Sequence, residues 1–449
     1  MLKQIRFVRL QVFILLFLFA TICLSQNIKS FSLQEAKEYA LENNHDIRDA
    51  LLEIKSAHKQ LWEVTARGFP QIESSAKYQY LVDIPTQLIP GEIFGQPGTT
   101  IPVKFGKPHN ASYGLSASQL IFSGSYFVGV QASRIFLKLS EENLERTETD
   151  LKATLTNTYH LILIAEENRS VLQETLKNLR KTKYEISEMY KEGFTEKTDV
   201  KQLQISVNEL ENNIRTLDEQ IEISYQLLKL QMGLPLDGQI ALTDDLDSFI
   251  KNKNYREQLQ RPFDPYNNIN LKAMQTQEHL RRLSLKKEKT TFLPTIAAFA
   301  TWQRDAQRDV FNLFDKKETW YPTTVIGVQL SWPIFNGSAK FHKIQRARVE
   351  LRRARIMKDK VEQGLTLEYK SAHSELSTAL DRYKTAEMNR DLARDVYEIT
   401  LEKYGEGLST SLDITQAHNQ YLNSEGKYLQ TISDLLAAET KLEKILQTL

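Results

Sequence analysis

The sequence contains one cysteine in 449 residues, and its positive and negative charges nearly cancel, to a net charge of +1 at pH 7. One cysteine cannot form a disulfide within the chain, and Cys23 lies in a segment that we expect to be removed. The balanced charge provides neither a broad basic surface for nucleic acid nor an acidic tail. The composition therefore argues against a disulfide-rich fold, and we expect no nucleic-acid partner.

Long apolar runs are absent except at the N-terminus. Residues 10–22 are mostly apolar, with basic residues before them and small residues after them (Lys3, Arg6, Arg9; Cys23, Ser25). This order is typical of a secretory signal peptide, and the run is too short for a membrane-spanning helix. We expect residues 1–25 to be removed, which would leave the mature chain without thiol chemistry. The alternative is lipidation of Cys23, but Ile22 is bulky where a lipoprotein signal has a small residue.

No other stretch approaches the roughly 20 consecutive apolar residues of a transmembrane helix. In lipid, every backbone polar group must be hydrogen-bonded within the protein. If this exported chain enters a membrane, it must therefore do so as a β-barrel.

Motifs for catalysis and for metal or cofactor binding are also missing from the sequence. The eight histidines are scattered, and none is spaced as in the His-x-x-x-His pair of a helical metal site. Ser123-Gly124-Ser125 lacks the Gly-x-Ser-x-Gly pattern of a nucleophile elbow, and no glycine-rich loop is present to bind phosphate. We expect no cofactor, no bound metal and no enzymatic activity.

The second half of the sequence repeats the plan of the first. Gly193 is followed six residues later by Asp199, and Gly407 is followed six residues later by Asp413. The segments 118–125 and 331–338 also correspond. A period above 200 residues is far longer than the roughly 20–50 residues of a solenoid unit. We therefore expect a duplicated domain, with a first repeat at 26–233, a linker at 234–267 and a second repeat at 268–449.

The apolar pattern in each repeat predicts two long helices. Residues 125–191 contain no proline, and their apolar residues recur at steps of three, four or seven, as in a coiled-coil seam. The pattern continues at 200–228 and recurs at 339–404 and 410–449, and shorter helices are expected at about 32–67 and 268–289. At 1.5 Å per residue, a helix of about 65 residues extends roughly 100 Å. These helices are too long for a single globular core.

Between the short and the long helix of each repeat, the apolar period changes from 3.6 to 2. Residues 323–335 set four apolar side chains against mostly small or polar ones, and residues 111–122 alternate in the same way. Hairpin partners are expected at 72–81 and 295–303, joined by long irregular loops at 82–110 and 304–322. Each strand has about the 9–11 residues that a tilted membrane strand needs. The predicted membrane-facing side chains are Ile326, Val328, Leu330 and Trp332.

Four strands cannot close a barrel, and an open edge in lipid leaves backbone groups unpaired. The chain must therefore associate with copies of itself. Three chains would give twelve strands, which is wide enough for a lumen, whereas two would give eight, where side chains tend to fill the interior.

The order and spacing of four motifs resemble those of the TolC-type outer-membrane efflux protein family, over about residues 32–449. Two motifs lie where a strand meets a helix, at Leu120-Ile121-Phe122-Ser123-Gly124 and Pro333-Ile334-Phe335-Asn336-Gly337. The other two lie at the helical turns, as Tyr190-x-x-Gly193…Thr198-Asp199 and Tyr404-x-x-Gly407…Leu412-Asp413. Each motif alone is weak, but their duplicated order with matching spacers is specific.

The resemblance implies a mainly α fold with membrane β-strands. Three copies would form a twelve-stranded β-barrel in the outer membrane and a twelve-helix α-barrel in the periplasm, with the linker 234–267 in an equatorial belt. The implied function is a passive exit duct in a tripartite efflux or type I secretion system. Its implied partners are a periplasmic adaptor, or membrane fusion protein, and an inner-membrane efflux or ABC pump, which usually selects the cargo. The alternative is a periplasmic coiled-coil adaptor or scaffold without its own pore, although such adaptors usually contain one hairpin rather than two.

The resemblance also places the periplasmic entrance at the two helical turns. There, Ser409 and Gln416 stand where some members have an arginine and a second lumen-facing aspartate. Asp413 remains as a candidate for a ring of three carboxylates, which would favour cations. The alternative is that Asp413 and Asp199 only cap their helices, with Thr410 and Asp413 forming a capping-box pair.

Four further residues belong to the same turns. Gly193 and Gly407 are expected to end their helices in a left-handed conformation, at the tips that would contact the adaptor. Tyr190 and Tyr404 are expected to pack at the end of the tunnel, with a gate switch as the alternative role.

Overall fold

The computed structural model describes residues 29–251 and 253–449, so the signal peptide expected at 1–25 and Cys23 lie outside the described residues. The chain divides into two compact units. Among the described residues, unit 1 comprises 29–51, 144–251, 253–269 and 362–449, and unit 2 comprises 52–143 and 270–361. Each unit therefore contains segments from both halves of the sequence.

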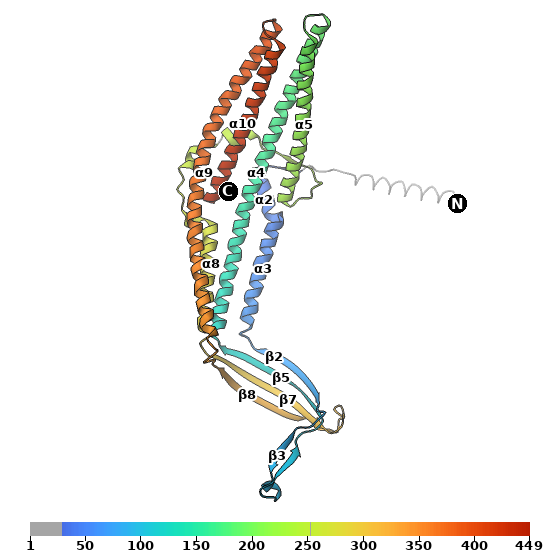
Figure 1. Ribbon diagram of the computed structural model, residues 1–449, viewed down its shortest axis with the longest axis vertical. Coiled ribbons are helices and arrows are strands. Elements are labelled where there is room, and N and C mark those ends of the chain that lie inside the picture. The colour runs from blue at the N-terminus through green and yellow to red at the C-terminus, as the bar shows by residue number, and fades with distance from the viewer. Residues whose placement is uncertain (1–28, 252) are drawn as a thin grey trace, which may run out of the picture. The chain divides into compact units, whose positions relative to one another are not determined.

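Two pairs of helices join at tight turns in unit 1 (Figure 1). Helix α4 (Gly124–Lys191) has 68 residues and is followed by α5 (Lys197–Met232), and α9 (Ala339–Gly405) has 67 residues and is followed by α10 (Ser411–Leu446). The long helices contribute residues to both units. The start and end of α4 and α9 agree with the predicted ranges to within one residue, because the heptad pattern is unbroken and glycines end it.

The first helical stretch, expected as one helix, is interrupted. Helix α2 (Leu33–Asn43) and helix α3 (His45–Ala66) are separated by Asn44, whose ψ of 141° is not helical. The Asn44 side-chain oxygen accepts hydrogen bonds from the backbone N–H groups of Asp46 and Ile47, at 2.8 and 3.2 Å, and so caps α3. Its amide donates to the carbonyl oxygen of Gln231 at 2.7 Å, which ties the break to the end of α5.

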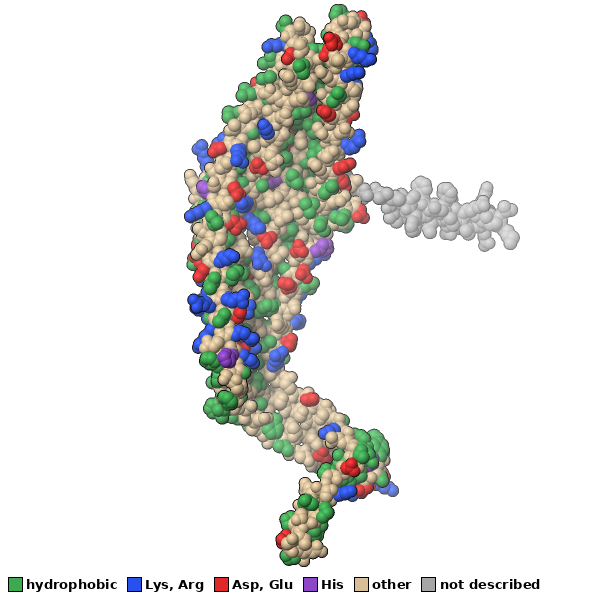
Figure 2. All heavy atoms as spheres, viewed as in Figure 1, with side chains coloured by type: hydrophobic (Ala, Val, Ile, Leu, Met, Phe, Trp, Pro, Cys, Tyr) green, Lys and Arg blue, Asp and Glu red, His purple; other side chains and the backbone are tan. Residues whose placement is uncertain are grey.

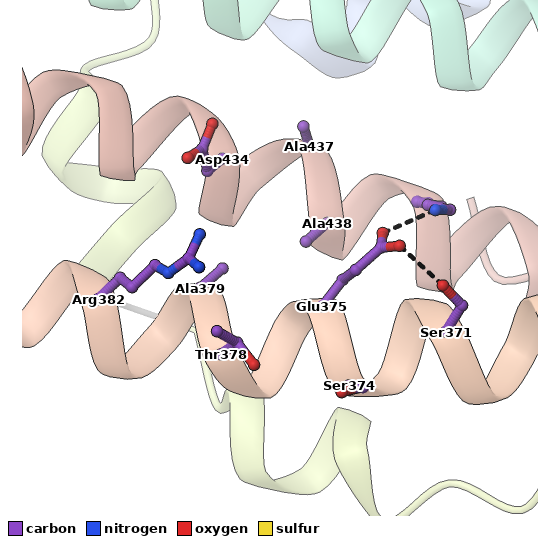
Figure 3. Close-up of a pocket in the computed structure, with 10 residues that line it drawn as sticks. Ser371, Ser374, Glu375, Thr378, Ala379, Arg382, Asp434, Ala437 and Ala438 are labelled. Atoms are coloured by element: carbon purple, nitrogen blue, oxygen red, sulfur yellow. Dashed lines mark hydrogen bonds and ion pairs between the residues drawn. The ribbon is translucent and has the colours of Figure 1, made fainter.

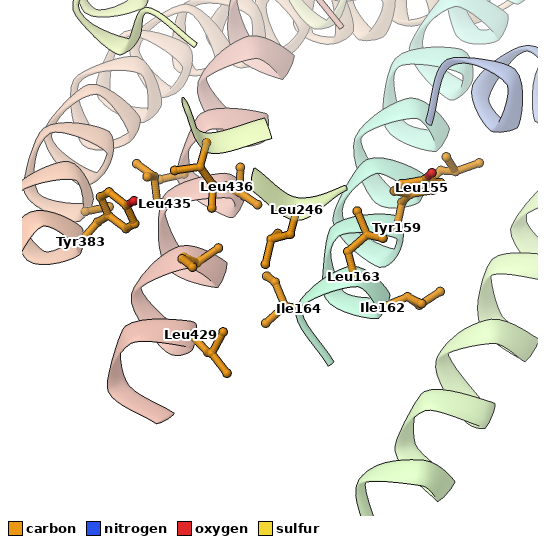
Figure 4. Close-up of a cluster of buried hydrophobic side chains, with 14 of the residues drawn as sticks. Leu155, Tyr159, Ile162, Leu163, Ile164, Leu246, Tyr383, Leu429, Leu435 and Leu436 are labelled. Carbon is orange, nitrogen blue, oxygen red and sulfur yellow. The ribbon is translucent and has the colours of Figure 1, made fainter. Parts of the chain in front are cut away.

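The linker lies within unit 1 and packs against its helices. Strand β1 (Lys29–Phe31) pairs in parallel with β6 (Ile240–Leu242), which is followed by the short helices α6 (Leu246–Lys251) and α7 (Tyr255–Leu259) and the 3-10 turn η2 (Pro265–Asn267). Side chains of α4, α9 and α10 form the largest hydrophobic cluster together with residues of α2, α5, α6 and α7 (Figure 4). Within it, the Tyr159 hydroxyl donates to the Phe31 carbonyl at 3.0 Å and to Asp244 at 2.9 Å. The linker is thereby joined to the long helices.

The two helix pairs have different cores near their turns. The α4–α5 pair encloses a cluster whose buried members are all aliphatic, namely Leu176, Leu179, Ile186, Leu203, Val207 and Leu210. The α9–α10 pair encloses Tyr397, Ile414 and Ala417, and it also buries His418, whose ring centroid lies 5.4 Å from that of Tyr397. Near the turns, the second pair therefore buries a tyrosine and a histidine, whereas the buried members of the first cluster are all aliphatic.

Unit 2 contains a four-stranded antiparallel sheet in the order β2-β5-β7-β8 (Figure 1). Its strands are β2 (Gln71–Tyr80), β5 (His109–Phe122), β7 (Thr295–Arg308) and β8 (Tyr321–Ser331). The expected hairpin pairings, β2 with β5 and β7 with β8, are both present. Helix α8 (Ile269–Thr290) precedes β7.

Two expectations about these strands were wrong. Strand β8 ends at Ser331, so Trp332 lies beyond it, where the indole N–H donates to the Phe292 carbonyl at 3.0 Å. The loop after β2 is not irregular throughout, because β3 (Thr86–Pro90) and β4 (Thr100–Lys104) form a hairpin around the 3-10 turn η1 (Gly91–Phe94). Its glycines lie in the connection, and Pro102, which is paired with Leu88 inside β4, is tolerated because β3 and β4 form a two-stranded sheet in which each strand has an unpaired edge.

Candidate functional site

The register of the sheet assigns each strand residue to one of two faces. Directly opposite residues in antiparallel strands point to the same face, and neighbours along a strand point to opposite faces. One row across all four strands contains Ile72, Ala117, Ala300 and Ile326. The next row on that face contains Ser74, Leu115, Trp302 and Thr324.

Apolar and aromatic side chains gather on this face, which we call the apolar face. Ile326, Val328 and Leu330 are 80%, 67% and 60% exposed. Such an extended apolar surface is unusual on a soluble monomer. The face carries Ile72, Tyr78, Tyr80, Tyr113, Leu115, Trp302, Ile326, Val328 and Leu330.

The opposite face, which we call the polar face, carries mostly hydroxyl, amide and charged groups. Its residues include Gln71, Glu73, Ser75, Lys77, Ser112, Ser116, Thr301, Gln303, Asp305, Thr323 and Gln329. Phe299 is an exception, and its ring covers Gly327 on the neighbouring strand. A Cβ added at Gly327 would lie 2.8 Å from the tip of that ring, so this position requires glycine or a shift of the phenyl group. The alternation of apolar and polar residues along the strands thus places the two kinds of side chain on opposite faces of the sheet.

The second candidate site is the pair of helical turns in unit 1. Gly193 and Gly407 have φ angles of +83° and +73°, in the left-handed region that favours glycine. In the second turn, the Gly407 N–H donates to the Tyr404 carbonyl at 2.9 Å and the Leu408 N–H donates to the Lys403 carbonyl at 2.8 Å. The first turn repeats this arrangement. Both glycines therefore end their helices in the predicted way.

Asp413 forms a capping box at the start of α10. Its carboxylate accepts from the Thr410 backbone N–H at 2.8 Å and from the Thr410 hydroxyl at 2.7 Å. The Thr410 hydroxyl oxygen in turn accepts from the Asp413 backbone N–H at 3.3 Å. The Thr410 hydroxyl and N–H lower the pKa of this exposed carboxyl. Asp413 is therefore an exposed, charged group, and Gln416 lies exposed one turn further along α10.

Asp199 occupies the matching position in α5 but has an additional partner. The Ser411 hydroxyl donates to one carboxylate oxygen of Asp199 at 2.5 Å, and the Thr195 hydroxyl donates to the other at 2.5 Å. Hydrogen bonds from Ser411 and Thr195 lower the Asp199 pKa. Because Ser411 is the first residue of α10, Asp199 links the turns of the two repeats. No local pattern in the sequence indicates this contact, since its two residues are 212 positions apart.

The remaining residues of the turns differ in their surroundings. Tyr404 packs against both hydrophobic clusters near the turns, and burial raises its pKa. Tyr190, its counterpart, is 41% exposed. The Ser409 hydroxyl donates to the Thr400 carbonyl at 3.2 Å, within its own helix pair. The structure therefore brings Asp199, Ser411 and Tyr404 together and leaves Asp413 and Gln416 facing solvent.

A groove of about 560 Å³ lies between α9 and α10 (Figure 3). Glu375 accepts from Lys441 at 2.6 Å and from Ser371 at 2.8 Å, and these two contacts lower its pKa. The charges at this end of the groove are thus paired within the chain. Among the described residues, no group of three or more histidine, cysteine, aspartate or glutamate side chains is arranged to hold a metal ion.

The helices of residues 29–251 and 253–449 include none that is both long enough and apolar enough to span a membrane.

The solved structures that share this fold include three outer-membrane proteins. The outer membrane protein VceC from Vibrio cholerae has a TM-score of 0.72 at 16% sequence identity, over 92% of this chain and 95% of VceC. The CmeC outer membrane channel of Campylobacter jejuni has a TM-score of 0.71 at 18% identity, over 93% of this chain and 85% of CmeC. The MtrE outer membrane channel of Neisseria gonorrhoeae has a TM-score of 0.72 at 16% identity, over 92% of this chain and 88% of MtrE.

No curated protein sequence matches this chain. The sequence pattern of the outer membrane efflux protein family, however, matches it twice, over residues 38–234 and 266–447. The two matches fall on the two halves of the duplication and together cover most of the sequence. The chain therefore belongs to the outer membrane efflux protein family.

Proposed function

We propose that this protein is the outer-membrane channel of a tripartite efflux or type I secretion system. It acts as a passive exit duct and catalyses no reaction of its own. Family membership places it in the outer membrane, with its helices extending into the periplasm. The solved structures of CmeC and MtrE, which have the same fold, are described as outer membrane channels, and MtrE was captured in an open state.

The observation that carries this proposal is the two-faced sheet. Its apolar face suits the hydrocarbon of a bilayer, and its polar face suits a water-filled lumen. The outer strands β2 and β8 are each paired on one side only. Because unpaired edges are costly in lipid, β8 of one copy would pair with β2 of the next. Three copies give a closed barrel of twelve strands with a lumen.

The helical turns suit the periplasmic entrance of such a duct. Asp413 is exposed and ionised, so three copies around the pore axis would form a negative ring that favours cations. Asp199 has a different role, because its carboxylate holds the two turns of one chain together through Ser411. The proposed entrance therefore has one aspartate for selectivity and one for assembly.

The tips of the turns suit contact with a periplasmic adaptor. Phe194 and Leu408 directly follow the turn glycines Gly193 and Gly407 and are 78% and 71% exposed. Exposed apolar groups at a helix-pair tip are a suitable surface for the helices of another protein. The adaptor would connect the duct to an inner-membrane efflux or ABC pump, which supplies the energy.

Conductance in planar lipid bilayers tests this function. Purified protein should give stepwise, long-lived increases in current across an otherwise sealed bilayer. The alternative function, a periplasmic adaptor or scaffold without a pore, predicts protein that is released without detergent and leaves the bilayer sealed. That result would refute the channel proposal.

A further inference from the structure

The two repeats have the same plan beside the sheet but differ sharply in charge there. Helix α8 has six basic residues (Lys or Arg) and two acidic residues. Residues 339–360 of α9 have nine basic and two acidic residues. The corresponding segments of the first repeat are nearly neutral. Helix α3 has three basic and four acidic residues, and residues 124–145 of α4 have two basic and three acidic residues. The fold that both repeats share therefore does not require the excess of basic residues in the second repeat, so these residues have a different role.

Part of this charge is neutralised inside unit 2. The buried Glu278 carboxylate lies 2.9 Å from Arg282, 3.2 Å from Arg355 and 3.8 Å from Lys358. This single acid joins α8 to α9. Other basic side chains lack such a partner: Lys287, Lys289 and Lys343 are exposed and form no ion pair within the described residues. Like charges gathered without counter-charges are unfavourable, so this surface suits an anionic partner.

The neighbouring residues indicate what kind of partner it is. Between β8 and α9, the side chains of Trp332, Ile334 and Phe335 are 59%, 84% and 85% exposed. Phe292 and Leu293, between α8 and β7, are about half exposed. Along both connections the order is apolar strand, exposed apolar belt, then lysines. That order matches the change from hydrocarbon through the interface to the headgroups of a bilayer. Apolar side chains this exposed favour lipid over a water-filled lumen.

Lys340 holds the two connections together. Its ammonium group donates to the carbonyls of Thr291 at 2.6 Å and Pro333 at 3.2 Å, and it lies 5.3 Å from the centre of the Phe292 ring. These contacts hold the end of α8 beside the start of α9. With a helical rise of 1.5 Å, Lys287, Lys289 and Lys343 lie within roughly 6 Å of those helix ends, a distance comparable to the headgroup layer. Figure 2 shows several Lys and Arg side chains on this strand-proximal part of the helices.

We propose that Lys287, Lys289 and Lys343 form a cationic surface that binds the phosphate groups of anionic phospholipids in the periplasmic leaflet. The inference rests on the membrane location of the sheet proposed above. Each lysine contributes a long apolar stem that lies along the belt and an ammonium group at headgroup level. The surface belongs to the second repeat alone, so each copy in the assembly contributes one such surface.

The test compares lipid retention by two triple variants of the full-length protein. In the first, Lys287→Gln, Lys289→Gln and Lys343→Gln remove the proposed surface. The matched control, Arg281→Gln, Arg352→Gln and Lys360→Gln, removes three exposed charges of the same helices further from the sheet. Each protein is reconstituted in nanodiscs of phosphatidylcholine with or without phosphatidylglycerol, then extracted in mild detergent, and its bound lipid is counted by native mass spectrometry.

We expect wild-type protein to retain phosphatidylglycerol over phosphatidylcholine, and the first variant to lose this preference by about five-fold for each lysine removed. The control variant should retain it. Equal loss in both variants, or no loss in the first, would overturn the proposal. Displacement of the lipid by millimolar inorganic phosphate would show a free-anion site instead. If wild-type protein forms conducting channels in pure phosphatidylcholine yet shows no lipid preference, this inference fails while the proposed function stands.

Discussion

Asp413 and Asp199 hold matching positions in the two turns, yet only Asp199 has a partner in the other repeat. The sequence predicted both carboxylates and the capping pair of Thr410 with Asp413. It could not predict Ser411, because a contact across 212 positions depends on how two helix pairs pack rather than on any local pattern.

The role of Asp413 in the pore is tested by Asp413→Asn. We expect the variant to lower cation selectivity in planar bilayers and to weaken block by multivalent cations, because it removes the only carboxylate ring proposed for the entrance. Asp199→Asn is the matched control and should leave selectivity closer to wild type. If Asp413→Asn changes neither selectivity nor block, Asp413 is only a helix cap.

The contact between the turns is tested by a double-mutant cycle in thermal unfolding. Asp199→Asn and Ser411→Ala should each destabilise the protein, and together they should cost less than their sum, with a coupling of about 0.5–1.5 kcal/mol for the shared hydrogen bond. The pair Asp413→Asn and Ser411→Ala should be additive. Additive effects in the first pair as well would mean that the Asp199 carboxylate does not hold Ser411.

Two buried histidines should make stability depend on pH. Burial lowers the pKa of His160 to about 3, with further lowering by Lys253 and Lys37, and burial lowers the pKa of His418 to about 4. Both folded-state pKa values lie below the ordinary value of about 6.5, so the unfolded chain binds more protons on acidification. The full free energy of unfolding is therefore retained above pH 6.5. It falls as the pH decreases, by about 2 kcal/mol per histidine at pH 5.

His160→Gln and His418→Gln should each flatten this dependence between pH 7 and pH 5, whatever their effect at pH 7. The measurement is the change in unfolding midpoint with pH for each variant. His58→Gln, at an exposed position of α3, is the control and should keep the wild-type slope. If the unfolding midpoint of both variants changes with pH as it does in the wild type, His160 and His418 do not cause the pH dependence.

At the scale of elements, periodicity predicted the long helices and the pairing of the four strands, because both depend on patterns sustained over many residues. It failed where a single side chain decides the outcome. Asn44 breaks the first helix because its side chain can cap α3 and also reach Gln231. The β3–β4 hairpin was missed because glycines and prolines in the loop suggested irregular structure.

The two faces of β8 provide the test at this scale. Val328→Arg places a charge on the apolar face and should cost about 2–4 kcal/mol near the bilayer midplane, with reduced assembly in the membrane. Gln329→Arg, on the polar face of the same strand, should be tolerated. The measurement is the yield of heat-resistant assembled protein in outer-membrane fractions. Equal yields for the two variants would mean that neither face of β8 meets lipid.

At the scale of the whole molecule, a sheet with two open edges and one apolar face is incomplete as a single chain. A closed barrel therefore requires assembly of several copies, and the mass of the detergent-extracted protein tests this assembly most directly. Native mass spectrometry of protein purified from outer membranes should give the mass of three chains, each lacking its first 25 residues. A stable single chain that stays soluble without detergent would contradict the trimeric membrane channel.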